Sequence, residues 1–464
     1  MTNHEKGFEN INDVFIKEVK VFLQSGQFID IATSVLDLDI FEHIEKPYLT
    51  AVMGYADFGG VNDYLSIRGG ERVEITICST HEDHEDIKKI FYIDKMISSQ
   101  KIKENEEFYI AHMIEDIGFL SKTENINRSY SGSGSDIIEK IASEFLDRDL
   151  DVLSTSEDQR NMKLIVPNMN PIESVSWIKN RLNTGDGYPF YLYSPLVNPY
   201  GCGPGKKSRQ VLELTDLNFL LTQAPMNPEQ AFFYTESTAT LTESQKMSIQ
   251  QRRTILSYET QKTADVFGLL EKGLVGSEYN YLDVTKYKQN EFEFDIEDDV
   301  NAKFRLTGAI KESSNVDVLK YDWAASKTPN TKKITQMGGT NSYENLQSLS
   351  ESPDIARYKN KVTSMSMANL LVKDPININV NGYDFLDGQM NTSIGRKIRI
   401  LFVKNRSDHD KTDDNNRLFD TSKSGDFLIY GCKHAIRQEG YTISMTAVKV
   451  SNDEDLEVPP ETTA

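Results

Sequence analysis

The residues that could do chemistry lie in a few polar segments, and the first is a loop rich in glycine and lysine. The sequence "YGCGPGKKS" at residues 200–208 has the residue types of a phosphate-binding loop, in which glycines let backbone amides approach the phosphates. The spacing does not fit, because Tyr200 stands five positions before Gly205 and Lys207 stands where that motif needs Ser or Thr. The pattern is typical of a solvated basic turn.

Two acidic segments contain groups that could hold a cation. "THEDHED" at residues 80–86 combines two histidines with four carboxylates, but the histidines are not four residues apart and no third ligand follows at a spacing that zinc sites use. "RSDHDKTDDNNRLFD" at residues 406–420 is rich in aspartate and lacks the central Gly and final Glu of an EF-hand loop. Both patterns favour solvated loops, so we assign no metal site.

No group of residues matches a known catalytic pattern. The sequence has no nucleophile elbow, no helix with two zinc-binding histidines and no Cys with a family signature beside a His. Cys78, Cys202 and Cys432 are too few and too scattered for a disulfide framework or a four-thiolate zinc site, which indicates free thiols. His434 is flanked by strand-like residues, and a lone His there is typical of a hydrogen-bonded structural residue. We therefore expect no enzyme activity and no cofactor.

The segments that would position these residues are mainly strand-like. "ERVEITI" at residues 71–77 alternates, with Val73, Ile75 and Ile77 on one face, which is the period of a half-buried strand. The runs at residues 87–99 and 106–114 are similar and are separated by the polar turn "QKIKEN". Further strand-like runs stand near the C-terminus, at residues 376–382, 396–404, 425–436 and 441–450. An antiparallel sheet or barrel is predicted.

The glycines just before this first strand are better explained by turns than by ligand binding. Gly59 and Gly60, with Asn62, are expected to turn the chain between strands. Gly69 and Gly70 are expected at a turn or bulge where the backbone needs positive φ. Strand alternation starts again at Val73, whereas a phosphate-binding loop would lead into a helix.

The middle of the chain is expected to contain helices. "NRSYSGSGS" at residues 127–135 is a Gly/Ser hinge, and the helix predicted over residues 136–150 starts with a capping box of Asp136 and Glu139. A second helix is predicted over residues 171–183, with Pro171 in its first turn, and a strand follows at residues 189–196. Three more predictions cover one or two exposed helices at residues 242–273, loops at residues 311–354 and a mobile acidic tail at residues 451–464.

Length and charge limit the classes of function. The 464 residues suggest about three domains. No apolar run approaches the length of a membrane span, and the first residues lack the apolar core of a secretory signal, so we expect synthesis in the cytoplasm and no membrane span. The 51 basic and 71 acidic residues give a net charge of −20, which disfavours stable attachment to DNA. A surface that guides DNA past without holding it is still compatible with this charge.

Several segments between Ile44 and Val450 follow one another in the order found in the central baseplate hub protein of contractile-tailed, T-even-type bacteriophages, which the chain resembles. The N-terminal segments are "YLSIRGGERVEITI", "FYIDKMISSQKIKENEEFYIAHMIE", "YSGSGSDIIEKIASEFL" and "LIVPNMNPIESVSWIKNRL" with "YPFYLYS". The later segments are "DVFGLLEKGLVGSEYNYLDVTK", "VNGYDFLDGQMNTSIGRKIRILF" and "FDTSKSGDFLIYGCKHAIRQEGYTISMTAVKVSND". Each motif is weak alone, and their order over most of the chain is the specific signal.

This resemblance implies a mainly β, α+β fold with two β-barrel-like tube domains and inserted helix-containing domains, assembling as a ring. The expected divisions are a first tube domain at 1–120, a helix-containing domain at 121–210, strands of the second tube domain at 211–240, a helical continuation at 241–310, the rest of the second tube domain with a spike-facing region at 311–450, and the tail at 451–464. From motif-bearing positions we take Gly69, Gly70, Asp283 and His434 as interface candidates.

The function that the resemblance implies is structural. Such hubs are late virion proteins that form homotrimers, so that three chains present six tube units to the six-fold tail tube or its initiator proteins. They join the tube to the trimeric central spike and surround the channel for DNA and the tape-measure protein during genome ejection. The expected location is the tail baseplate of the virion, after assembly in the host cytoplasm. Closing the ring would cover strand edges in an obligate interface, expected to exceed ~2,000 Å².

Two other functions stay open. One is a tail-associated enzyme that degrades the cell wall, although the sequence has no zinc signature or Cys/His motif to support it. The other is the hub part of another contractile injection system, in which the hub is fused to a needle. That architecture needs a small-barrel domain and a repetitive β-helix, and the sequence ends about a dozen residues after the last predicted strand. We therefore expect the spike to be a separate polypeptide.

Overall fold

A computed structural model describes most of the chain. The described residues are 14–23, 26–58, 60, 67–79, 86–103, 106–154, 161–197, 210–226, 231–234, 253–261, 266–283, 288–303, 333–338, 355–372, 375–382, 393–402, 423–438 and 440–450. Several predictions therefore fall outside the described residues: the glycine-rich loop at 200–208 with Cys202, the acidic segment at 406–420, the tail at 451–464, the turn residues Gly59 and Asn62, and all of residues 80–86 except Asp86.

The described residues form a mainly β fold with helices, as the sequence predicts, and its largest element is a sheet of thirteen strands. Its main path runs through β14 (Ser257–Thr260), β18 (Pro375–Asn381), β21 (Gly440–Lys449), β20 (Gly425–Arg437), β3 (Val35–His43), β4 (Thr50–Asp57), β7 (Glu106–Glu115), β6 (Ile87–Lys103), β5 (Arg72–Ser79), β1 (Val14–Phe22) and β2 (Phe28–Asp30). Beside this path, β19 (Lys397–Phe402) pairs with β20 and with β13 (Phe232–Tyr234). The short helix η1 (Ala32–Ser34) leads into β3.

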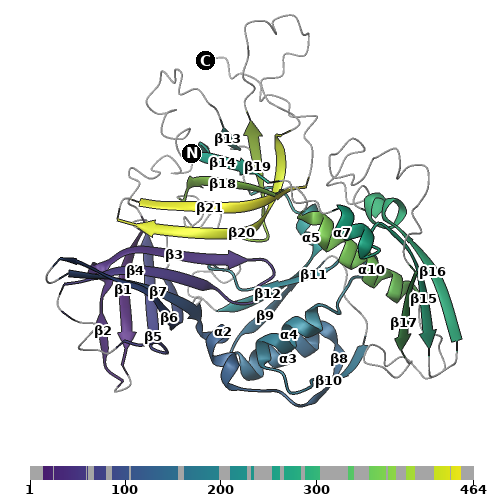
Figure 1. The fold of residues 1–464 in the computed structure, drawn as a ribbon, viewed down its shortest axis with the longest axis horizontal. Helices are drawn as coiled ribbons and strands as arrows, with labels where there is room; N and C mark the ends of the chain where they lie inside the picture. The colour runs from purple at the N-terminus through teal and green to yellow at the C-terminus, as the bar shows by residue number, and fades with distance from the viewer. Residues whose placement is uncertain are drawn as a thin grey trace, which may run out of the picture.

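Strands from the two ends of the chain meet in the middle of this sheet. β3 and β20 pair antiparallel from Asp37 opposite Arg437 to His43 opposite Gly431, and we call this pair the seam. β1 also approaches β20 and β21, so the sheet curls back on itself, as Figure 1 shows by the purple and yellow strands lying together. One hydrophobic core cluster extends across both groups of strands. The seam therefore lies inside the fold.

The predicted strands in the first part of the sheet are confirmed, with differences in detail. Val73, Ile75 and Ile77 of β5 are buried, but so is Thr76 on the other face. β6 is 17 residues long and includes most of the predicted polar turn at 100–105. Three register shifts against β7 accompany this length, and such bulges bend a strand while it stays paired.

A smaller α/β unit packs below the main sheet (Figure 1). It contains the pair β8 (Ser129–Ser133) with β10 (Asn161–Ile165), and a sheet in which β12 (Val211–Asp216) lies between β11 (Phe190–Tyr193) and β9 (Asp149–Leu153). Its helices are α2 (Asp116–Leu120), η2 (Ser121–Thr123), α3 (Gly134–Phe145), α4 (Pro171–Lys179) and α5 (Leu217–Thr222). A second core cluster lies between α3, α4 and these strands.

Both helices predicted here are present, but the start of the first was predicted wrongly. Most of the predicted Gly/Ser hinge forms strand β8. Ser133 is the N-cap of α3, and its side chain accepts a hydrogen bond from the Asp136 amide. Ser133 therefore caps the helix where we expected Asp136, because Ser is an equally good N-cap and stands at the strand end. α4 has Asn170 as its cap and Pro171 at its first position.

A third group of elements stands at one side of the molecule (Figure 1). It contains the sheet β16 (Lys288–Asp295), β15 (Gly276–Asp283) and β17 (Lys333–Gly338), with α7 (Val266–Glu271), the π-helical turn η3 (Glu297–Asn301) and α10 (Ile355–Leu371). Of the one or two exposed helices predicted over residues 242–273, α7 is present and ends close to Gly273, but residues 257–260 form β14 instead. Residues 333–338 of the predicted loops form β17. α10 was not predicted, because the buried Thr363 and Ser366 interrupt its apolar face.

Candidate functional site

Gly69 and Gly70 have the positive φ angles that the sequence predicts, 122° and 88°. The Gly70 amide donates to the Ile93 carbonyl at 2.7 Å, and a Cβ on Gly69 would lie 3.3 Å from the Asp94 carbonyl oxygen. The two glycines therefore let the chain turn tightly against β6 before it enters β5. Their part in an interface stays a prediction.

The structure does not bring the four interface candidates together. Asp283 ends β15, where its backbone lies opposite Lys288 and Gly338 in the small side sheet. His434 lies in β20 of the main sheet, and the glycines precede β5. His434 lies in a cluster of buried polar side chains.

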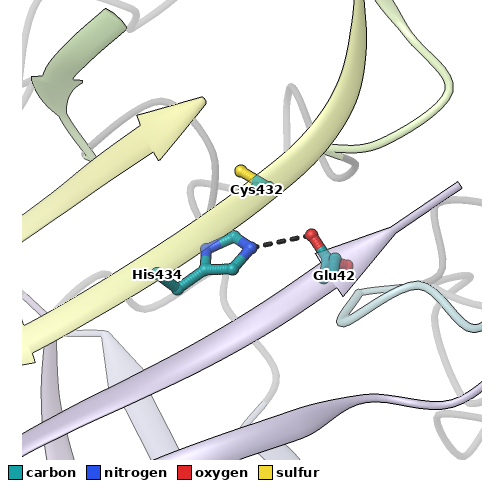
Figure 2. Close-up of side chains that lie close together, drawn as sticks. All are labelled: Glu42, Cys432 and His434. Carbon is teal, nitrogen blue, oxygen red and sulfur yellow. Dashed lines mark hydrogen bonds and ion pairs between the residues drawn. The ribbon is translucent and has the colours of Figure 1, made fainter. Parts of the chain in front are cut away.

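His434 joins a hydrogen-bond network across the seam. Its Nε2 lies 2.8 Å from Glu42 Oε2 of β3 (Figure 2). Its Nδ1 lies 2.7 Å from the Tyr441 hydroxyl of β21. The Ser393 hydroxyl donates to Glu42 Oε2, and the Leu196 amide donates to Glu42 Oε1. Glu42 and His434 are 3% and 1% exposed. His434 is therefore buried and hydrogen-bonded, as the sequence predicts, and its part in an interface stays a prediction.

Two more buried carboxylates hold the segment that contains Leu196. This segment, residues 193–196, begins at the last residue of β11, and we call it the junction segment. Glu115 accepts hydrogen bonds from the Leu49 amide at 2.8 Å and the Ser194 hydroxyl at 3.3 Å. Lys89 lies 3.7 Å from Glu115 and donates to the Pro195 carbonyl at 3.0 Å. Glu115 and Lys89 of the main sheet thus bind the junction segment just after β11 of the α/β unit.

Glu213 of β12 lies at the other end of the junction segment. The Tyr193 hydroxyl donates to its Oε2 at 2.9 Å, while Oε1 has no hydrogen-bond partner among the described residues. Burial raises the pKa of the Glu213 carboxyl, although the Arg396 charge and the Tyr193 hydroxyl oppose that shift. Protonation is thus easier for Glu213 than for an ordinary glutamate.

The groups at the seam have shifted pKa values for clear physical reasons. Burial acts to raise the pKa of Glu42, but attraction to His434 and hydrogen bonds from His434, Ser393 and the Leu196 amide outweigh it, so the pKa is lowered. Burial and the nearby Glu42 charge raise the pKa of the Cys432 thiol well above its usual value. Burial also raises the pKa of Tyr441, and the charges of Cys432 and Glu42 add to that shift. The cluster therefore holds a carboxylate beside a neutral thiol and a neutral phenol.

This arrangement is suited to holding strands together. A catalytic nucleophile has to be both activated and reachable by substrate, whereas Glu42, Cys432, His434 and Tyr441 are all buried. Cys78 and Cys432 are free thiols, and Cys78 donates to Asp86 at 2.7 Å.

Among the described residues, no helix is both long enough and apolar enough to cross a membrane.

The sequence contains a local signal for the buried Glu42, although the acidic composition of the chain hides it. Leu38, Ile40 and Glu42 alternate on one face of β3, Ile44 follows directly after the strand, and all four are buried. A carboxylate inside such an apolar series indicates a buried partner, because an unpaired charge is costly to bury. In so acidic a chain the number of Asp and Glu residues says little, but their position in the strand period is informative.

Glu213 gives a pH-dependent prediction. Because its pKa is raised in the folded chain, protonation stabilises the fold below the ordinary glutamate pKa, and that contribution is lost as pH rises through the raised value. Glu213→Gln cannot titrate, so its stability relative to the parent chain should increase from acid to neutral pH. Urea unfolding of both chains at a series of pH values measures this trend. A relative stability that falls with rising pH would contradict the prediction.

Comparison with known proteins shows where this fold occurs. No protein-family model matches the sequence, and the search of curated proteins found no match. Among solved structures, a tail protein from Neisseria meningitidis MC58 is 12% identical, with a TM-score of 0.50 over 94% of this chain and 96% of that one. The 43 kDa tail protein of prophage MuSo2 from Shewanella oneidensis is 9% identical, with a TM-score of 0.51 over 94% and 98%. At these identities the likeness shows a shared fold.

Proposed function

We propose that this chain is the central hub of a contractile phage tail baseplate, joining a six-fold tail tube to a trimeric spike. The observation that carries the proposal is the fold, which a tail protein and a prophage tail protein share over 94% of this chain. The order of hub-like motifs along the sequence points to the same role. In this role the protein is a structural part of the virion tail, and its ring surrounds the channel for DNA and the tape-measure protein.

The sheet arrangement supports two tube domains in one chain. In our proposal β1 to β7 form the first tube domain, and β13, β14 and β18 to β21 form the second, with the seam between them. Three chains would then present six similar units to the tube. We place the start of the second tube domain at β13, where the sequence analysis placed it at residue 211, because β12 pairs with β9 and β11 of the α/β unit and β13 pairs with β19 of the main sheet.

Exposed apolar side chains near one end of the main sheet support a contact with a neighbouring chain. Phe15 of β1 and Phe28 of β2 are 44% and 52% exposed, and β2 is the last strand on its side of the sheet path. An edge strand has unpaired backbone groups and is a site where another chain can pair. In a closed ring, a neighbouring subunit would cover both the edge and the two phenylalanines.

Molecular mass in solution tests the hub proposal. Light scattering should give three copies for the chain alone and a three-to-three assembly with a separately purified trimeric spike protein. Phe28→Glu should lower the trimer fraction, because it places a charge in the proposed contact. Phe267→Glu is the control, since Phe267 of α7 is exposed but lies outside the main sheet.

Two outcomes would overturn this function. A wild-type chain that stays monomeric at micromolar concentration contradicts the ring. Cell-wall lytic activity that survives purification, and is lost when a single carboxylate or histidine is replaced, would make the enzyme alternative the better explanation. The mass measurement and the lytic assay are independent, so the hub proposal and the enzyme alternative can be judged separately.

A further inference from the structure

We propose that Glu42, Cys432 and His434 form a zinc-binding site in the seam. A carboxylate oxygen, a thiol sulfur and an imidazole nitrogen of these residues all lie within 4.8 Å of one another. These are the three kinds of ligand atom that zinc takes in proteins, and a tetrahedral site needs them this close. The site would be independent of the hub function, since it depends only on contacts within one chain.

The seam places the three side chains by strand geometry. Cys432 and His434 are two residues apart on β20 and therefore project from the same face, and Glu42 of β3 lies directly opposite Cys432 in the register. In Figure 2 the His434 ring faces the Glu42 carboxylate, and the Cys432 side chain projects from the strand beside them. Both strands lie inside the main sheet, so the ligands stand on rigid elements.

Two further side chains complete the surroundings of a zinc site. The Ser393 hydroxyl donates to Glu42 Oε2, so it lies beside one of the three ligands. Ser393 or a water molecule would supply the fourth ligand. The second ring nitrogen of His434 lies 2.7 Å from the Tyr441 hydroxyl, and metal-bound histidines usually have such a partner, which fixes the orientation of the ring.

Charge balance favours a divalent ion with one thiolate. On binding, the S–H bond of Cys432 breaks, a zinc–sulfur bond forms and the proton leaves to solvent. The hydrogen bond between Glu42 and His434 is replaced by coordination of both groups to the ion. Zinc, one thiolate, one carboxylate and a neutral imidazole sum to zero charge, so the buried cluster carries no net charge. Calcium and magnesium do not fit, because they take mainly oxygen ligands.

The metal content of the full chain, purified without an affinity tag, tests the proposal. After equilibration with zinc and gel filtration, elemental analysis should find about one zinc per chain. Cys432→Ser should lose most of this zinc. Cys78→Ser is the matched control, because Cys78 is the other buried free thiol of the described residues and lies away from the cluster on β5. Circular dichroism and thermal unfolding show whether each variant is folded.

Cobalt gives a second readout that does not depend on retained zinc. Cobalt bound by Cys432 should produce a thiolate-to-metal absorption band in the parent chain and in Cys78→Ser, but not in Cys432→Ser. A parent chain that keeps no zinc, and whose melting temperature is unchanged by added zinc, would overturn the proposal. So would a folded Cys432→Ser chain that holds as much zinc as the parent.

Discussion

Replacing Glu42 by alanine is expected to lower the free energy of unfolding by about 3–5 kcal/mol, because each buried group left without its hydrogen-bond partner costs about 1–3 kcal/mol. The carboxylate is the acceptor for the Leu196 amide and the Ser393 hydroxyl and is the partner of His434 Nε2. Without it, all three groups stay buried with no acceptor, and each loses its hydrogen bond without gaining one from water. Urea unfolding in buffer with a chelator measures the loss without a contribution from metal.

Asp39→Ala is the matched control for this prediction. Asp39 lies on the same strand and pairs with Lys433 at 2.7 Å and Arg437 at 3.4 Å, but these partners are 35% and 40% exposed. Ion pairs at this exposure contribute roughly 0–1 kcal/mol, so the control should cost little. If Glu42→Ala is no more destabilising than Asp39→Ala, the seam network is not what holds β3 to β20.

Local sequence patterns predict much of this fold because they report the period of each element. The alternation of Val73, Ile75 and Ile77 predicts β5, and Pro171 in a helical pattern predicts the start of α4. Each of these patterns spans only a few residues. They show which face of an element is buried, but they cannot show what covers that face.

The seam could not be predicted in this way, because its partners are far apart in the sequence. Glu42 and His434 are separated by 392 positions, and no local period connects them. The same limit applies to β12. Its sequence predicts a strand, but it does not show whether that strand joins the main sheet or the sheet of the α/β unit, where it pairs with β9. The candidate site was therefore only partly predictable: His434 was singled out, while Glu42 and Cys432 needed the fold.

The three buried carboxylates have one mechanical consequence. Glu42, Glu115 and Glu213 all contact the junction segment at residues 193–196, from strands β3, β7 and β12. The junction segment is thereby fixed to β3 and β7 of the main sheet and to β12 of the α/β unit. In the proposed hub role the units would have to move together, and buried hydrogen bonds of defined geometry resist sliding better than apolar packing alone.

The pair of Lys89 and Glu115 gives the second large prediction. Both side chains are buried, at 8% and 1% exposure, and their charged atoms lie 3.7 Å apart. Glu115→Gln keeps the side-chain shape but leaves the Lys89 charge buried without a counter-ion, so we expect a loss of about 3–5 kcal/mol. Lys89→Met should also destabilise, because Glu115 then loses its counter-ion and the Pro195 carbonyl loses its donor. Chemical unfolding of the two single variants and the double variant measures these losses.

The double variant separates this pairing from general damage to the core. Once both charges are removed, neither is left alone, so the combined loss should be smaller than the sum of the single losses by about 0.5–3 kcal/mol, the usual coupling of contacting residues. The exposed pair Lys122 and Glu173, 2.7 Å apart at 63% and 50% exposure, is the control. Its coupling should stay below about 1 kcal/mol, because solvent screens both charges. Additive losses for Lys89 and Glu115 would mean that the junction segment is held by its hydrogen bonds and packing, and that the buried charges contribute no specific coupling to the fold.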